Sequence, residues 1–138
     1  MAPNVVALCT CIALLFFLAY FLMALVPFLF VKLTEPTVAF LFRGLFRNCF
    51  LLIAGAGGIA AIAFIVTGNP VFAIGVALFS AFDIAARRWF LQRLDTQWSA
   101  NAAGDGMAPR RLRRLHLSGM GVILAQLAIV IGSITFVV

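Results

Sequence analysis

Asp83 has the clearest chemical potential in this chain, because it is the one acidic residue in an apolar stretch at residues 71–91. An ionisable side chain inside a membrane helix is a candidate functional group by default. Asp83 precedes Arg87 by four residues, the favourable order for an ion pair on one helix face, and Ser80 shares that face. Arg47 is expected at similar depth on the preceding helix. We therefore predict an intramembrane ion pair of Asp83 with Arg87 and Arg47; a proton- or substrate-carrying role for Asp83 is the alternative.

The cysteines and the histidine predict no metal or redox site. Cys9 and Cys11 are two residues apart and point to opposite sides of a helix. With His116 as its one histidine and no Cys-x-x-Cys pair, the chain lacks the ligands for a zinc or bis-histidine haem site. Metalloprotease, serine-hydrolase and phosphate-loop motifs do not occur either. We expect no enzyme activity and no cofactor, and we expect His116 to form hydrogen bonds at the membrane interface.

The composition places these residues in lipid. Of 138 residues, 65% are hydrophobic and 10% are charged, against roughly 45–50% and about 25% in soluble domains. A soluble domain of this size has too little interior to bury so much apolar surface. This argues against a soluble enzyme, a disulfide-stabilised secreted scaffold and a disordered tail. A net charge of +6 would suggest nucleic acid in a soluble protein, but here the charge is segregated along the chain, so no nucleic-acid partner is expected.

Four stretches are apolar and long enough to cross a membrane, and they are expected to be helices because backbone groups in lipid must bond within their own segment. The predicted spans cover residues 5–31, 46–66, 71–91 and 115–138. Pro27 predicts a kink or break near the end of the first span. Residues 38–45 are expected to enter along the interface, and residues 92–114 to form a polar cytoplasmic loop. The predicted fold is a single all-α domain, an integral membrane bundle of four transmembrane helices.

The basic residues predict the orientation. All ten flank two of the three connections: Lys32, Arg43, Arg47, Arg87, Arg88, Arg93, Arg110, Arg111, Arg113 and Arg114. The positive-inside rule places these two connections in the cytoplasm and both termini on the other side, and we expect a bacterial inner membrane. Four of these arginines are expected to attract anionic lipid headgroups at about 1 kcal/mol per charge: Arg110, Arg111, Arg113 and Arg114.

Small residues recur at heptad spacing along the last span. This small-residue seam consists of Ser118, Gly121, Ala125, Ala128, Gly132 and Thr135. Small residues let helix backbones approach closely in lipid, with a crossing angle of about +20°. We expect the seam to be the tightest helix contact of the protein, either within the bundle or, if it faces outward, with another subunit. Leucine at Gly121 and Gly132 is then expected to be harmful, and leucine at Ile123 or Ile131 harmless.

Three segments carry a resemblance to a family. They are residues 27–30 (Pro-Phe-Leu-Phe), residues 38–46 around Arg43, and residues 114–120, where Leu-His-Leu-Ser includes His116 and is followed by Gln126. Together they resemble the small four-helix membrane proteins related to eukaryotic transmembrane protein 205, whose bacterial members form a domain of unknown function. The resemblance covers nearly the whole chain and implies the fold and the membrane location, but no catalytic residues. The small-residue seam departs from it, since bulkier leucines are expected there.

Three classes of function follow from these features. The first is a non-enzymatic accessory or scaffold subunit of a larger membrane assembly, for example a bioenergetic complex, which would associate with other membrane subunits or with itself. The second is a small oligomeric transporter or exporter that uses Asp83. The third, a membrane enzyme or redox protein, lacks the required ligand sets. Small size and the absence of catalytic motifs favour the first class.

Overall fold

A computed structural model describes residues 2–137 of the chain, and the exposure of side chains for residues 5–135. It contains four long α-helices and one short 3-10 helix: α1 Ala2–Leu25, η1 Val26–Phe30, α2 Pro36–Val66, α3 Pro70–Ala102 and α4 Ala108–Val137. No strand occurs between residues 2 and 137. The predicted all-α fold is confirmed.

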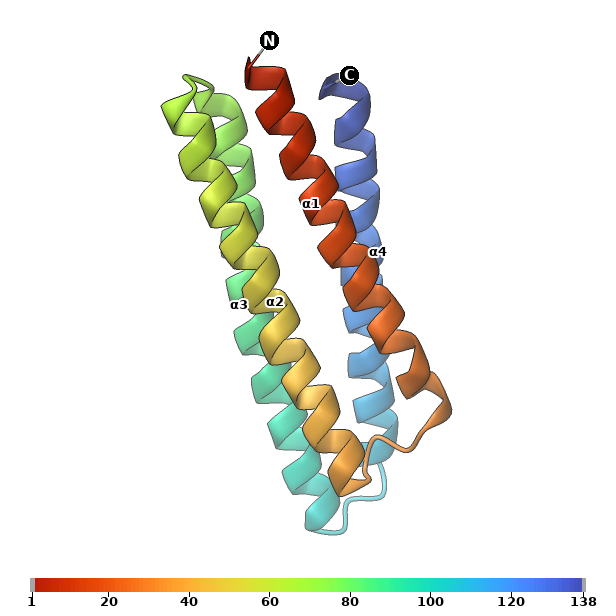
Figure 1. The fold of residues 1–138 in the computed structure, drawn as a ribbon. Coiled ribbons are helices and arrows are strands. Elements are labelled where there is room, and N and C mark those ends of the chain that lie inside the picture. Colours follow the sequence, from red (N-terminus) through yellow and green to blue (C-terminus); the bar gives the residue numbers. More distant parts are fainter. Residues whose placement is uncertain (1, 138) are drawn as a thin grey trace.

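The helices run alternately up and down, and each packs against two neighbours (Figure 1). α2 packs against α3 and α1 against α4, while α1–α2 and α3–α4 contacts close the bundle. The α1–α2 and α3–α4 connections lie at one end, and the described chain ends and the α2–α3 turn lie at the other (Figure 1). All four helices are long and apolar enough to cross a membrane, as an integral multi-pass protein requires. The basic residues gather at the end with two connections, which we call the basic end.

Prolines set three of the helix boundaries. α1 ends at Leu25, and η1 follows it with Pro27 near its start, so the break predicted at this proline is present. Pro36 and Pro70 occupy the first positions of α2 and α3, where the missing N–H has no helical partner in any case. Gly68 closes the turn between these helices with a φ of 77°, in the left-handed region that favours glycine.

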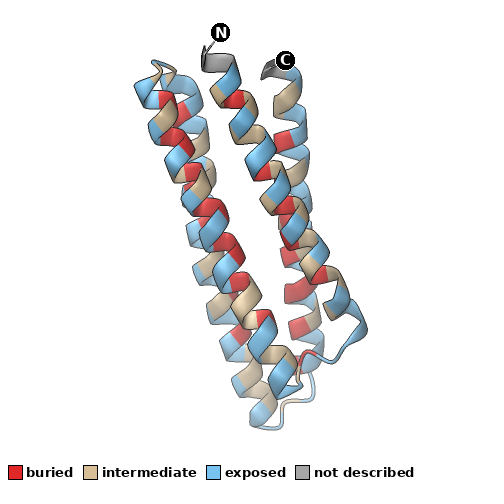
Figure 2. Cartoon of the chain, viewed as in Figure 1, coloured by how far each residue is buried: buried red, intermediate tan, exposed pale blue. Residues whose placement is uncertain are grey.

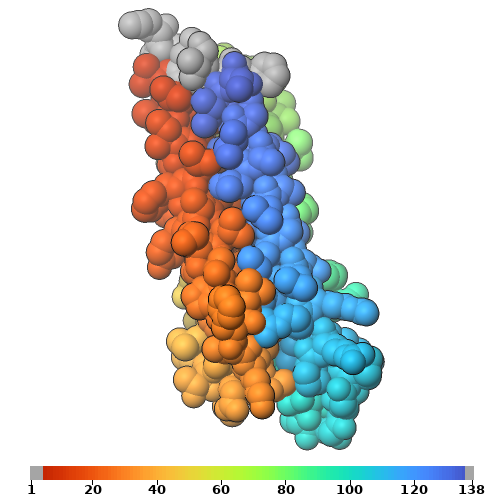
Figure 3. Space-filling model, turned by 90° about the vertical axis from the view of Figure 1, so that its right-hand side faces the viewer, coloured from red at the N-terminus to blue at the C-terminus, as the bar shows by residue number. Residues whose placement is uncertain are grey.

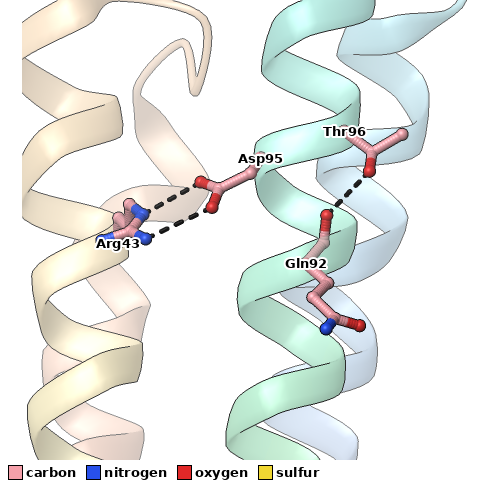
Figure 4. A network of polar contacts seen from close by, with 4 residues as sticks. All are labelled: Arg43, Gln92, Asp95 and Thr96. Carbon is pink, nitrogen blue, oxygen red and sulfur yellow. Dashed lines mark hydrogen bonds and ion pairs between the residues drawn. The ribbon is translucent and has the colours of Figure 1, made fainter.

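The prediction that residues 92–114 form a polar loop is wrong. α3 continues to Ala102 and α4 begins at Ala108, so most of this stretch is helical. Contacts with the first connection and with α2 hold the polar end of α3 in place. Asp95 accepts two hydrogen bonds from Arg43, at 2.9 and 3.2 Å (Figure 4). The indole N–H of Trp98 donates to the backbone oxygen of Leu33 at 2.9 Å. Polar composition indicated exposure to water, but it does not exclude a helix.

α2 also extends beyond its predicted span. It begins at Pro36 rather than at residue 46, so residues 38–45 form the first turns of one continuous helix. Phe42 on this segment is fully buried, which explains why the chain stays helical there despite Arg43. Figure 2 shows the buried residues of α2 as a stripe along the helix.

An aromatic core joins the helices toward the basic end. Its rings belong to α1, α2 and α3: Phe21, Phe42, Phe46, Phe50 and Phe90, each fully or almost fully buried. Phe21 meets Phe46 and Phe50 edge-to-face, with ring centroids 5.6 and 5.1 Å apart. Each such pair stabilises the fold by about 0.5–1.5 kcal/mol beyond simple burial.

Two glycines lie directly against side chains of other helices, and neither belongs to the small-residue seam. A Cβ atom on Gly119 of α4 would lie 2.5 Å from the ring of Phe46, and one on Gly57 of α2 would overlap the side chain of Ser80. Around Gly121 and Gly132, by contrast, there is open space. The expectation that the seam forms the tightest contact within this chain is therefore wrong.

We predict that Gly119→Leu lowers the free energy of unfolding in detergent by about 1–3 kcal/mol, because the new side chain collides with Phe46. Gly121→Leu, two residues along the same helix, is the matched control and leaves the stability of the isolated chain unchanged. Thermal unfolding of both variants in the same detergent measures the difference. Equal stability of the two variants would contradict the packing described here.

Candidate functional site

Asp83 and Gln126 form a buried polar pair between α3 and α4. Asp83 is fully buried and Gln126 is 4% exposed. The side-chain amide of Gln126 donates a hydrogen bond to Oδ1 of Asp83 at 2.6 Å. This pair joins two membrane-spanning helices through side chains alone.

The predicted ion pair of Asp83 with Arg87 and Arg47 is not formed. Arg87 instead donates from Nε to the backbone oxygen of Arg47, at 3.0 Å. Between residues 2 and 137, the ion pairs are Arg43–Asp95 and Arg111–Asp105. The long side chain of Arg87 reaches the backbone of α2, whereas the short side chain of Asp83 faces α4. Spacing along one helix therefore did not decide the partner of Asp83.

Several polar atoms at this level of the bundle have no hydrogen-bond partner. They are Oδ2 of Asp83, Oε1 of Gln126 and the hydroxyl oxygen of Ser80, all buried. A cleft of about 250 Å³ between α3 and α4 lies against Gln126. Its other lining residues are apolar: Phe79, Phe82, Val122, Ala125 and Ile129. Asp83 and Gln126 thus sit in apolar surroundings with unused hydrogen-bonding capacity.

A second polar cluster stabilises the break between α1 and η1. Arg113 of α4 donates to the backbone oxygens of Phe28 and Val31, at 2.6 and 2.8 Å. Arg113 also lies 3.0 Å from Nδ1 of His116, and Nε2 of His116 lies 2.9 Å from the backbone oxygen of Leu25. Because a guanidinium only donates, Nδ1 accepts and the Nε2–H donates to Leu25. These two side chains bind backbone carbonyls between Leu25 and Val31, the segment that contains the break at Pro27.

His116 was expected at the interface as a hydrogen-bonding residue, and it does form hydrogen bonds, but inside the protein. It is fully buried, and its ring packs edge-to-face against Phe42, with centroids 5.2 Å apart. No group of three or more histidine, cysteine, aspartate or glutamate side chains among the described residues could hold a metal ion.

The four arginines predicted to bind lipid headgroups have different environments. Arg113 donates its hydrogen bonds to backbone carbonyls of the chain itself. Arg111 pairs with Asp105 at 2.9 Å; the backbone N–H of Met107, followed by the guanidinium of Arg111, holds the pKa of Asp105 below its ordinary value. Arg110 and Arg114 are exposed and stay candidates for headgroup contacts.

All six residues of the small-residue seam are exposed on the outside of the bundle. Figure 3 shows α4 and α1 side by side on one outer face of the molecule. A different heptad stripe on α4 faces inward: Leu112, His116, Gly119, Ile123, Gln126 and Val130, all buried. Ile123 is fully buried, so the structure reverses the expectation that it tolerates replacement freely.

Gln126 is the site residue that reasoning from the sequence did not assign to a role. The available signal was an amide inside an otherwise apolar span, at heptad spacing from His116 and Gly119. That spacing could have paired it with an acid on a neighbouring helix.

Toward the end of the bundle opposite the basic end, a cavity of about 250 Å³ lies among all four helices. Its lining includes Thr10 and Cys11 of α1, Phe64 of α2, Phe79 of α3 and Ser133 of α4. The hydroxyls of Thr10 and Ser133 donate to carbonyls of their own helices, so the cavity presents mainly apolar surface.

Comparison of the chain with protein-family models, with curated proteins and with solved structures gives no match. The resemblance to the transmembrane protein 205 family stays a prediction. The fold and the site define a class, a multi-pass four-helix membrane protein with a buried acid–amide pair, and the function is argued from that geometry.

We predict that Arg113→Lys lowers the free energy of unfolding by about 1–3 kcal/mol, because lysine lacks the planar fork that reaches two carbonyls and His116. Arg114→Lys, on the exposed face of the same helix, is the control and is expected to be neutral. Denaturant unfolding in detergent micelles measures both. A neutral Arg113→Lys would show that the break at Pro27 does not depend on these bonds.

Proposed function

We propose that this chain is a non-enzymatic accessory or scaffold subunit of a larger membrane assembly, and that the small-residue seam of α4 contacts a transmembrane helix of a different subunit. The observation that supports this proposal most strongly is that all six seam residues are exposed on a membrane helix. The inward side of α4 is already filled by its own stripe of buried residues. The seam is therefore free for an external partner.

The physical argument concerns packing in lipid. Apolar side chains gain no hydrophobic energy from helix association there, so association depends on close van der Waals contact. Gly121 and Gly132 leave open space at the surface, which acyl chains fill less well than a complementary helix. Most of the large exposed side chains elsewhere on the bundle, such as Ile59 and Leu78, suit contact with lipid.

A small oligomeric transporter that uses Asp83 is the second candidate. The buried, unpartnered oxygens of Asp83 and Gln126 favour it. Against it, α1, α2 and α4 contain no acidic residue. The accessory role therefore stands first.

For the membrane and the orientation, we propose the bacterial inner membrane, with the basic end in the cytoplasm and both chain termini on the other side. Two connections and the ten basic residues at one end support this proposal. Exposed Arg110 and Arg114 would then meet the anionic headgroups of the cytoplasmic leaflet.

We predict that Gly121→Leu combined with Gly132→Leu releases the partner without unfolding the chain, because bulk is added only at the seam. Native sizing after gentle detergent extraction, with identification of co-migrating chains, measures the assembly. Gly55→Leu is the matched control, since Gly55 is an exposed glycine of α2 with equally open space. A wild-type chain that migrates alone or only with copies of itself would overturn this proposal, as would an unchanged assembly in the double variant.

We predict that a topology reporter fused after Val138 is active only on the non-cytoplasmic side, because both basic connections are retained in the cytoplasm. A second fusion in the 103–107 connection is the control and should show cytoplasmic activity. The opposite pattern would reverse the proposed orientation.

A further inference from the structure

The hydrogen bonding of Asp83 and Gln126 is incomplete as long as the carboxyl is ionised. One bond joins them, from Nε2 of Gln126 to Oδ1 of Asp83 at 2.6 Å. Oδ2 of Asp83 and Oε1 of Gln126 are then two buried acceptors with no donor. An ionised carboxylate only accepts, and so does an amide oxygen. Such orphaned groups are rare in folded proteins and call for an explanation.

We propose that Asp83 is a proton-binding site, whose bound proton closes a second hydrogen bond to Gln126 and clamps α3 to α4. A protonated carboxyl offers one donor and one acceptor side by side, and a primary amide offers the same pair in the complementary order. A single proton on Oδ2 makes this oxygen a hydrogen-bond donor, and Oε1 of Gln126 then accepts its bond. Both orphaned atoms are then satisfied within the same pair of side chains.

The charges around Asp83 support a neutral carboxyl. The other charged and titratable groups on the four helices are Cys9, Cys11 and Tyr20 of α1, Arg43, Arg47 and Cys49 of α2, Arg87, Arg88, Arg93 and Asp95 of α3, and Arg110, Arg111, Arg113, Arg114 and His116 of α4. None of them bonds to the carboxyl in the described part of the chain, and Arg87 is directed at the backbone of Arg47. An isolated carboxylate in apolar surroundings is so costly that it takes up a proton instead.

The proton has a mechanical consequence. α3 and α4 are joined near the middle of the bundle by this pair, and the cleft beside it contains no other polar side chain. Removal of the proton leaves a buried charge without a cation and breaks the second bond, so the α3–α4 contact weakens. Gln126 adjoins Ala125 of the small-residue seam on the same helix, but the proton site is argued independently of the proposed subunit contact.

Infrared spectroscopy of the wild-type protein in detergent at neutral pH tests the proposal directly. The other three side-chain carboxyls have polar surroundings: Glu35 is exposed, and Asp95 and Asp105 pair with arginines. The C=O stretch of a protonated carboxylic acid is therefore expected from Asp83 alone. It should be absent from Asp83→Asn, and a spectrum of the wild type without this band would overturn the proposal.

The pH dependence of stability gives a second, independent test. The folded protein holds a proton that the unfolded chain releases, so the stability of the wild type should fall as the pH rises from mildly acidic to alkaline. Asparagine forms the same two-bond ring with Gln126 without a titrating proton. We therefore expect Asp83→Asn to keep the low-pH melting temperature of the wild type across the whole range.

Three further variants distinguish a proton-dependent pair from an ion pair and from simple packing. Asp83→Leu and Gln126→Leu should each lose stability at low pH, because they leave a buried polar partner unsatisfied. Arg87→Gln should retain the slope of the wild type. A slope that disappears in Arg87→Gln, or an Asp83→Asn variant as unstable as Asp83→Leu, would overturn the proton site.

Discussion

The constraint on which this structure depends is that a polar group buried in lipid must find its partner inside the protein. α4 carries three such groups on one face, in Arg113, His116 and Gln126. Arg113 and His116 bind carbonyls around the break between α1 and η1, and Gln126 binds Asp83 of α3. These bonds fix the rotation of α4 about its own axis, so that the stripe from Leu112 to Val130 faces inward.

The rotation of α4 determines which of its residues face the outside of the bundle. With the polar stripe inside, the small-residue seam faces outward, where it has no counterpart within the described chain. Gly119 then lies against the ring of Phe46, which leaves no room for a side chain at this position. The surface proposed for a partner is thus a direct consequence of how the interior polar groups are satisfied.

The two ends of the bundle are packed by different kinds of side chain. Toward the basic end, Phe21, Phe42 and Phe46 interlock, and hydrogen bonds from Arg113 and Trp98 tie the helices to the first connection. At the other end, small and aliphatic residues leave a cavity among the four helices. The Asp83–Gln126 pair joins α3 to α4 between these regions.

Composition and the lengths of the apolar runs by themselves determined the fold class, the number of helices and the break at Pro27, because backbone hydrogen bonding in lipid permits few alternatives. The seam residues, at three- and four-residue spacing, were correctly placed on one common face. Only the tertiary structure decided which face turned inward and which partner each polar group found. Asp83 bonds to Gln126, 43 residues away, rather than to Arg87. Periodicity defines a face but not its neighbour, and the neighbour follows from how the four helices satisfy all their buried polar groups together.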